Sequence, residues 1–519
     1  MRIRKLLRVR FVVYSFTEQE KIMAELTPMM QKYMETKEQY KDCILFYRLG
    51  DFYEMFFDDA IVASKELEIA LTGKSCGLEE RAPMCGIPYH AVETYLARLV
   101  SRGYKVAICE QVEDPKLAKG LVKREVIRVV TPGTNLDVQS LEASKNNYLM
   151  CIAYTSDGIG ISAADVTTGD YYVTEVEDLR KLKDELMKYE PSEIICNEAF
   201  LVSGYDVEDL KSRLHMSVSS LESHMFDDDG CRRILMRHFK VNTLIGLGVE
   251  EFPTGILAAG ALLQYLYDTQ KTDLEHFTHI SPYLTSKYML LDSSTRRNLE
   301  LTETLREKQK RGSLLWVLDR TKTAMGGRLL RNYIEQPLID KEEMEKRLDA
   351  IQELNQDSIS RDEIREYLNP VYDLERLLSK VTYKTANPRD LIAFRNSLQM
   401  LPPIKTVLAG FQKEALAAIR EEIDGLEDIY QLIDEAIVEE PPISIREGGM
   451  IKDQFDETID HLRAAKHDGK QWLVQLEEED RERTGIKNLK IKKNNVFGYF
   501  FEVTNSYKDL VPEDYIRKQ

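Results

Sequence analysis

The sequence predicts a multidomain protein in which mixed α/β segments are followed by an all-α segment and a small antiparallel β hairpin. The chain has 519 residues, and single hydrophobic cores seldom grow beyond roughly 250 to 300 residues, so several domains are expected. Runs of β-branched residues bounded by turn residues fill the first half, whereas from about residue 283 apolar residues recur at helical spacing. A lysine-rich pair of strand-like runs near residue 490 completes the pattern.

Residues 23–137 are predicted to form a mixed α/β domain. Ala91–Val100 places its apolar residues at helical spacing, and Val106–Ile108 and Val126–Val130 are β-branched runs typical of buried strands. The Pro132-Gly133 pair and the polar residues after it are typical of a linker, so the domain is expected to end near residue 137.

Residues 146–275 are predicted to form a second α/β domain that begins with an antiparallel meander. Short turns containing Ser-Asp-Gly and Thr-Gly-Asp separate three strand-like runs. These runs are Tyr148–Tyr154, Gly158–Asp165 and Tyr171–Glu175. A helix over Leu179–Tyr189 and a buried strand over Ile194–Cys196 are expected to follow.

The last two segments are predicted to be helical and then hairpin-forming. Residues 283–454 are expected to be a long-helix domain, because Met344, Leu348, Ile351 and Leu354 recur at helical spacing. Its helices are expected to end before the prolines at positions 337, 370, 388, 402 and 403. Residues 455–519 are expected to form a charged helix over Phe455–Arg483 and then two strands, Leu489–Lys493 and Tyr499–Val503.

Composition restricts the function classes. The formal net charge is −17, from 88 acidic and 71 basic residues, which argues against a polycation that coats nucleic acid but leaves a local basic surface possible. The seven cysteines are scattered without a CxxC pair, so a structural zinc site is not expected, and a reducing cytosol is the simplest compartment. There is no apolar run of membrane-spanning length, so no membrane association is expected.

The first 22 residues stand apart from the rest of the chain. They are basic at the start and then briefly apolar, but the apolar run is too short for a signal peptide and no small-residue cleavage site follows. Residues 1–22 are therefore expected to be an extension or a mis-assigned start.

The segment Arg48–Phe57 combines an aromatic cluster with Gly50 and with Glu54, a carboxylate two residues after Phe52. From residue types alone, Phe52 and the phenylalanines after it are expected to be core residues, since large aromatics are mostly buried. The alternative is a ring on a tight turn that enters a base stack. A carboxylate beside such a ring repels phosphates, and it makes chemical sense if it accepts a hydrogen bond from a base edge.

Several motifs follow one another from about Met23 to the end of the chain. In the first half these are the Arg48–Phe57 segment, Pro83–Val92, Val106–Gln111 and Val129–Thr134. The second half adds Leu291–Glu300, Leu318–Leu330, Phe497–Phe500 and Val511–Gln519. Any one of these motifs would be a weak signal, but in this order and spacing they resemble the MutS family of DNA mismatch-repair proteins.

The resemblance implies an architecture and a set of site residues. Residues 23–137 would be the mismatch-recognition domain, 146–275 an RNase H-like connector, 283–454 the first half of a lever domain and 455–519 a β clamp. Phe52 would stack on the mismatched base, and Glu54 would read its edge. The clamp tip would contact the DNA backbone through Lys487, Lys490, Lys492, Lys493, Asn494 and Asn495.

The function implied is recognition of mismatched or unpaired bases in duplex DNA, by aromatic insertion and kinking, at the start of mismatch repair. The implied partners are duplex DNA with mismatches or small loops, a MutL-type repair protein and, for the full-length form, a second copy in a homodimer; the implied location is the bacterial cytoplasm. The family's ATPase domain lies beyond the clamp, so this chain is expected to have no catalytic residue, nucleotide site or metal of its own. ATP and Mg²⁺ are expected for the full-length protein.

Three other interpretations follow from particular residues. Gly73-Lys74-Ser75 resembles the end of a phosphate-binding P-loop, but the glycine required five residues earlier is Glu68, so the match is expected to be a coincidence. An RNase H-like nuclease centred on Asp165 would need several carboxylates around two metal ions. A MutS-like scaffold that binds other DNA structures is the third alternative.

Overall fold

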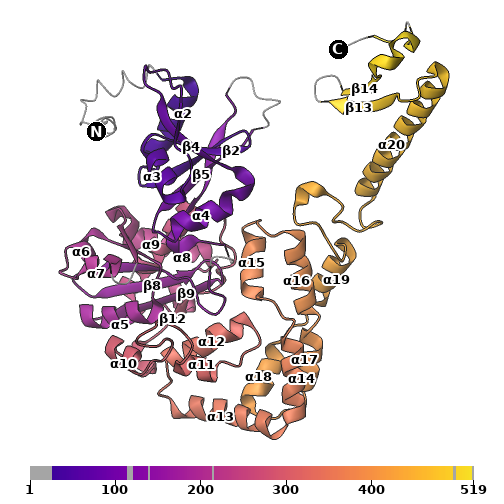
Figure 1. Ribbon diagram of the computed structural model, residues 1–519. Helices are drawn as coiled ribbons and strands as arrows, with labels where there is room; N and C mark the ends of the chain where they lie inside the picture. Colours follow the sequence, from indigo (N-terminus) through magenta and orange to yellow (C-terminus); the bar gives the residue numbers. More distant parts are fainter. Residues whose placement is uncertain are drawn as a thin grey trace. The chain divides into compact units, whose positions relative to one another are not determined.

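The computed structural model describes residues 26–113, 121–137, 141–212, 216–494, 498–512 and 514–516 (Figure 1). Two compact units are present. The first contains the described residues up to Ala386 together with Asn396–Gly425, and the second contains Asn387–Arg395 with the described part of Leu426–Gln519. The expected extension, residues 1–22, lies outside the described residues. The predicted combination of mixed α/β and helical segments is confirmed, while the predicted domain boundaries stay predictions.

A mixed six-stranded sheet begins the first unit, in the order β3-β4-β2-β1-β5-β6. Strands β1 and β5 pair in parallel and the other neighbours pair antiparallel. The strands are β1 Cys43–Leu49, β2 Phe52–Phe56, β3 Thr72–Lys74, β4 Ala82–Pro88, β5 Lys105–Gln111 and β6 Arg124–Val130. The helices are α2 Pro28–Gln39, α3 Phe57–Leu67 and α4 Val92–Val100 (Figure 1). The helix expected over Ala91–Val100 and the strands around Val106–Ile108 and Val126–Val130 are confirmed.

Both faces of this sheet are covered, and each face has its own apolar cluster. The face beside α3 and α4 packs Phe46, Met55 and Ile87, and the face beside α2 packs Met30 and Phe56. Because two buried cores hold the central strands, side chains on the short connections at the sheet edge are attached to a firm support.

A second six-stranded sheet follows in the order β11-β10-β7-β8-β9-β12. Its strands are β7 Leu149–Tyr154, β8 Ile159–Asp165, β9 Asp170–Val176, β10 Glu193–Cys196, β11 Ser217–Ser220 and β12 Ser281–Pro282. Its helices are α5 Leu179–Tyr189, α6 Glu198–Leu201, α7 Val207–Ser212, α8 Asp228–His238 and α9 Pro253–Gln270. The predicted meander is confirmed by the antiparallel pairs β7–β8 and β8–β9.

Helix α9 is buried along most of its length against this sheet and α8. Gly160 of β8 permits the close approach, because a Cβ atom there would lie 1.9 Å from the carbonyl oxygen of Thr254. The two α/β parts of the unit meet at Glu193, which is fully buried. Its carboxylate accepts hydrogen bonds from Thr131 and Tyr265 and lies 3.6 Å from Lys105 Nζ.

A helical region completes the first unit. Its helices are α10 Ser293–Asn298, α11 Leu314–Leu318, α12 Ala324–Glu335, α13 Lys341–Gln356, α14 Ser358–Leu368, α15 Leu374–Thr382, α17 Leu401–Leu408 and α18 Glu414–Glu422. The helices before Pro337 and Pro370 end as predicted. Pro388 and the Pro402-Pro403 pair also lie in the first turns of the helices that follow, α16 Pro388–Leu398 and α17, where a missing N–H costs nothing.

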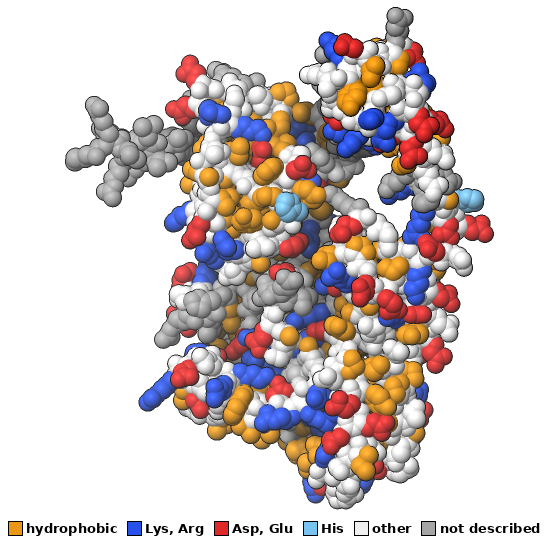
Figure 2. All heavy atoms as spheres, turned by 45° about the vertical axis from the view of Figure 1, so that its right-hand side comes forward, with side chains coloured by type: hydrophobic (Ala, Val, Ile, Leu, Met, Phe, Trp, Pro, Cys, Tyr) orange, Lys and Arg blue, Asp and Glu red, His pale blue; other side chains and the backbone are white. Residues whose placement is uncertain are grey.

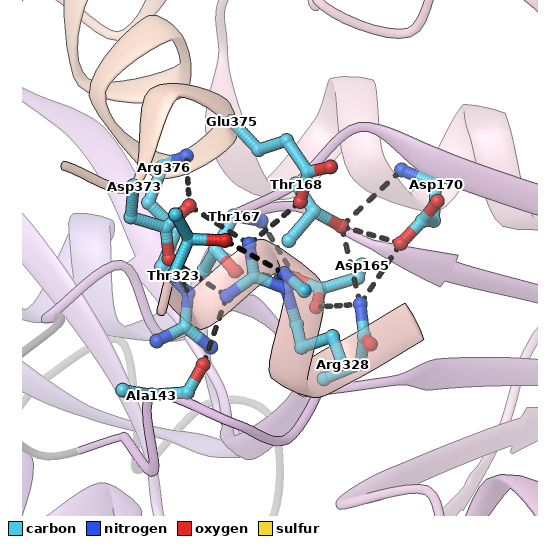
Figure 3. Close-up of polar contacts among 12 residues, drawn as sticks. Ala143, Asp165, Thr167, Thr168, Asp170, Thr323, Arg328, Asp373, Glu375 and Arg376 are labelled. Atoms are coloured by element: carbon cyan, nitrogen blue, oxygen red, sulfur yellow. Dashed lines mark hydrogen bonds and ion pairs between the residues drawn. The ribbon is translucent and has the colours of Figure 1, made fainter. Parts of the chain in front are cut away.

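Arg328 of α12 connects this helical region internally (Figure 3). Its guanidinium makes two parallel hydrogen bonds to Asp373, of 2.7 and 2.8 Å, and a third of 2.6 Å to Glu375. It also donates to the carbonyl oxygen of Ala143, at 2.9 Å. One buried side chain therefore holds α12, the start of α15 and the segment that precedes β7.

The second unit contains most of α16 Pro388–Leu398, α19 Glu427–Ala436, the long helix α20 Glu457–Thr484 and a hairpin of β13 Lys490–Asn494 and β14 Gly498–Glu502. The predicted charged helix and the predicted pair of strands are both confirmed, each within two residues of its expected start. No helix among the described residues is both long enough and apolar enough to span a membrane.

Candidate nucleic-acid interface

The turn between β1 and β2 places the start of the aromatic segment at the ends of two inner strands of the first sheet. Leu49 pairs with Phe52, so Gly50 and Asp51 form a two-residue connection. Gly50 has φ +59°, a backbone conformation that glycine adopts without strain at the first position of a tight hairpin turn. The sharp turn expected at this glycine is confirmed, and it places Phe52 at the first residue of β2.

Phe52 is the exception in its aromatic cluster. Its surface is 47% exposed, whereas Phe56 is 1% exposed and Phe57 is partly buried in the core beside α2. The interpretation of all three as core residues is therefore correct for Phe56 and wrong for Phe52. The exposed ring on a braced turn is therefore accessible to an apolar or stacking partner.

Arg48 braces the turn from the β1 side. Its Nε donates to the carbonyl oxygen of Gly50 at 2.5 Å, and its Nη1 contacts Glu110 at 3.1 Å. The guanidinium carbon lies 3.9 Å from the ring centroid of Tyr89, in cation–π geometry. Tyr53 donates to the same Glu110 carboxylate. The backbone that carries Phe52 is therefore fixed by side chains from several elements.

Glu54 lies on the same face of β2 as Phe52, because residues two apart in a strand point the same way. Its side chain is 17% exposed, and Lys74 Nζ of β3 donates to Glu54 Oε2 at 2.5 Å. Gly86 of β4 is opposite Glu54, and a Cβ atom at Gly86 would lie 3.5 Å from Glu54 Cγ. The carboxylate is thus held on one face of an inner strand by one ammonium group.

The lysine-rich hairpin presents its predicted residues to solvent. Lys487, Lys490, Lys492 and Lys493 are all exposed, and Asn494 at the end of β13 is partly buried. Asn495 lies outside the described residues. The space-filling view shows lysine and arginine side chains gathered on one side of the body that carries this hairpin, with acidic side chains on another (Figure 2). A local basic surface therefore exists on a chain whose net charge is negative.

The hairpin lysines differ in their surroundings. Lys492 pairs across the strands with Glu502, with its Nζ 2.7 Å from Oε2, and Lys493 Nζ lies 5.4 Å from the ring centroid of Tyr499. Within the described part of the chain, no ion pair is present at Lys487 or Lys490. Glu502 is opposite Lys490 in the β13–β14 register, but among the described residues its carboxylate pairs with Lys492 rather than with Lys490.

Helix α20 supports the hairpin through a few contacts. Glu477 accepts a hydrogen bond from the backbone N–H of Ile491 at 2.7 Å and another from Arg481 at 2.5 Å. Ile486 and Leu489 are fully buried beneath the first strand. Phe501 of β14 stacks on Tyr515 with ring centroids 5.3 Å apart. The hairpin rests on this small base.

The nuclease interpretation centred on Asp165 does not fit the geometry. Asp165 is fully buried, and its carboxylate accepts hydrogen bonds of 2.7 to 2.9 Å from Asn146, from the Asn147 N–H and from both the N–H and hydroxyl of Thr167 (Figure 3). Burial raises the pKa of Asp165 above its usual value, while the hydrogen bonds from Thr167 and Asn147 oppose that shift. The carboxylate is a structural group at the end of β8.

Two carboxylates that follow Asp165 in the chain, Glu175 and Asp178, also have structural roles. Glu175 accepts hydrogen bonds from the N–H groups of Thr254 and Gly255, at the first turn of α9, and Asp178 caps the N-terminus of α5. The described residues contain no group of three or more metal-binding side chains.

Models of three successive protein domains match this chain. MutS domain I matches residues 27–139, MutS domain II residues 147–280 and MutS domain III residues 294–510, which together cover more than half of the 519 residues. The chain belongs to the MutS family. Phe52 and Glu54 fall within the domain I match, and the described hairpin lysines fall within the domain III match.

Bacterial relatives agree with the family. The DNA mismatch repair protein MutS of Lachnoclostridium phytofermentans is 65% identical over 497 residues, covering 96% of this chain and 53% of that protein. The protein of the same name from Ruminiclostridium cellulolyticum is 54% identical, covering 96% of this chain and 57% of that protein. The Acetivibrio thermocellus protein is 53% identical with the same coverage. The chain therefore spans about half the length of the curated relatives it matches.

Lys74 is the site residue that sequence reasoning missed. Its Gly-Lys-Ser context resembles a phosphate-binding loop, but Lys74 is the last residue of strand β3 and its ammonium group binds Glu54. A P-loop connects a strand to a helix N-terminus, and here β3 leads to β4 in an antiparallel pair. Arg48 and Glu110 were missed as well, because the contacts that brace the turn join separate strands.

Proposed function

We propose that this chain recognises mismatched or unpaired bases in duplex DNA at the start of mismatch repair. The observation that carries the proposal is the half-exposed ring of Phe52 on a braced two-residue turn, with the Glu54 carboxylate on the same face of the strand. The name of the relatives, DNA mismatch repair protein MutS, supports it.

The physical basis of selection is the energy of deforming DNA. A mispaired base loses fewer hydrogen bonds and less stacking when it leaves the helix than a paired base does. A ring that enters the stack and kinks the duplex therefore selects weak base steps, and it tolerates any sequence because every base has a π-face. Glu54 adds discrimination, because it accepts a hydrogen bond from a base N–H and repels phosphates.

The hairpin has a different task in this proposal. Lys487 and Lys490 would contact backbone phosphates, which position the duplex and carry no sequence information. Lys492, Lys493 and Asn494 would lie beside them at the tip of a clamp, and the same role is proposed for Asn495. The second sheet would act as an RNase H-like connector, and the helical region would act as part of a lever.

The whole protein would have further partners. We expect it to couple mismatch binding to ATP binding and hydrolysis with Mg²⁺, outside the residues of this chain. We also expect it to form a homodimer, to signal to a MutL-type repair protein and to work in the cytoplasm. These expectations rest on family membership.

The decisive test replaces Phe52. Fluorescence anisotropy measures Kd for a fully matched duplex, for a duplex with a G·T mismatch and for a duplex with a single unpaired base. Selectivity is the Kd for the matched duplex divided by the Kd for either of the other two. Phe52→Ala is expected to reduce that ratio about 10- to 100-fold, the scale of one base–aromatic stack.

Tyr499→Ala is the matched control, since Tyr499 is also an exposed aromatic residue but lies on the hairpin. Its loss is expected to leave the ratio unchanged. A Phe52→Ala variant that retains the parent's selectivity would refute the proposed function.

A further inference from the structure

We propose that Lys74 is a specificity-determining residue that positions the Glu54 carboxylate for base reading. This inference rests on the proposed function. It assigns a role in mismatch selectivity to a residue of another strand that is hydrogen-bonded to Glu54. Lys74 Nζ is 2.5 Å from Glu54 Oε2, and among the described residues it is the sole hydrogen-bond partner of that carboxylate.

The Lys74 side chain must extend along the sheet to contact Glu54. Lys74 pairs with Ala82 in the β3–β4 ladder, whereas Glu54 pairs with Gly86 farther along β4. To reach Glu54, the lysine extends over the ring of Phe56, with Nζ 5.5 Å from the ring centroid. The ammonium group thus lies over a buried ring while it donates to the carboxylate.

The surroundings restrict the carboxylate to this arrangement. The Glu54 side chain is 17% exposed and the Lys74 side chain 34% exposed, so the pair is screened less than a surface pair. Gly86 leaves space beside Glu54 Cγ that a side chain would occupy. Because Lys74 binds Oε2, the second oxygen of Glu54 is the one left to accept from a base N–H.

Lys74 has a second effect, on charge. A carboxylate with no partner at the edge of a DNA-binding surface repels every duplex, matched or mismatched. The lysine offsets part of that repulsion while it holds the carboxylate in one position. Selectivity should therefore depend on the pair, rather than on Glu54 alone.

The experiment is a double-mutant cycle of Lys74→Met and Glu54→Gln, read as the ratio of Kd for matched duplex to Kd for G·T duplex. Lys74→Met alone is expected to lower the ratio about tenfold, the scale of one charge-assisted hydrogen bond. In the Glu54→Gln background it is expected to leave the ratio within about twofold, because the two groups act as a unit.

A lysine that binds phosphate directly would behave differently. Lys74→Met would then weaken matched and mismatched binding equally in both backgrounds and reduce the salt slope by about one unit. That result, or an unchanged ratio in the single variant, would overturn the inference. Lys123→Met is the matched control for charge, since Lys123 is an exposed, ion-paired lysine in the same domain. It is expected to leave the ratio unchanged.

Failure of this inference is distinguishable from failure of the proposed function. If Phe52→Ala loses selectivity while Lys74→Met keeps it, mismatch recognition stands and the role of Lys74 is refuted. Circular dichroism of each variant checks that it folds. Lys74→Met is expected to fold, because Lys74 is partly exposed and lies on a three-residue edge strand, β3.

Discussion

The turn that carries Phe52 is held in place by more buried and hydrogen-bonded contacts than the hairpin that carries Lys490. The first projects from a six-stranded sheet with an apolar cluster on each face, and Arg48 and Glu110 brace it. The second is a two-stranded sheet that rests on one helix through Glu477 and two buried residues. Both surfaces are exposed, but the turn is supported by two large buried clusters and the hairpin by few buried residues.

The difference matches the kinds of contact proposed for each surface. Insertion between bases requires a ring held in one place, because a displaced ring loses the stack. Phosphate contact tolerates movement, since the attraction acts over several ångströms and a lysine side chain is itself flexible. Firmness should therefore govern selectivity at the turn, while charge should govern affinity at the hairpin.

The largest expected effect is on local stability, and it is tested by replacing one supporting carboxylate in each region. Asp59 of α3 is 7% exposed; it accepts from the Leu45 N–H at 2.9 Å and pairs with Lys37 at 2.9 Å. Asp59→Ala is expected to reduce the opening free energy of β1 by about 3 kcal/mol, because the Leu45 N–H and the Tyr33 hydroxyl lose a buried acceptor and Lys37 loses its ion pair. Hydrogen–deuterium exchange of residues 43–49 measures it.

Glu477→Ala is the counterpart in the hairpin, where the side chain is 26% exposed. Its effect on exchange at Ile491 is expected to be about 1 to 2 kcal/mol, since water can replace the lost partner. Equal losses in the two regions would contradict the contrast in firmness.

The next effect concerns the carboxylate beside the ring. Glu54→Gln removes a negative charge that faces intact duplex, so matched DNA is expected to bind more tightly while G·T binding changes less. The ratio of the two Kd values should fall about tenfold, comparable to one charge-assisted hydrogen bond. Anisotropy titrations of both duplexes measure it, and an equal change for both would reject the discriminating role of Glu54.

The smallest effect tests the hairpin. Lys490→Ala is expected to reduce the slope of log Kd against log salt by about one unit for matched and mismatched duplexes alike. Lys492→Ala should change the slope less, because Glu502 already compensates that ammonium group. A change in selectivity from either lysine variant would show that the hairpin does more than position DNA.

Local sequence patterns predicted many elements closely. The helix over Leu179–Tyr189 has the bounds that its spacing indicated, because its apolar residues repeat on one face and an Asp caps its start. Helix α9 was not predicted, since it is apolar on nearly every side and therefore has no amphipathic period. The short strands β2 and β3 were also missed, because long-range pairing rather than alternation defines them.

The candidate site was predictable in part. Phe52 and Glu54 are two residues apart, so their shared face follows from strand geometry once a strand is assumed. The exposure of Phe52 was not predictable from residue type, because the same segment contains the buried Phe56. The contact between Glu54 and Lys74 depends on the sheet order β3-β4-β2, which no local pattern contains.

The junction at Glu193 has an evolutionary consequence. One buried acid contacts Lys105 and Thr131 from the first α/β part and Tyr265 from the second. Replacing any one of these residues would leave a buried polar group with fewer partners. Substitutions there should be inherited together, and an alignment of relatives should show these positions drifting as a set rather than one by one.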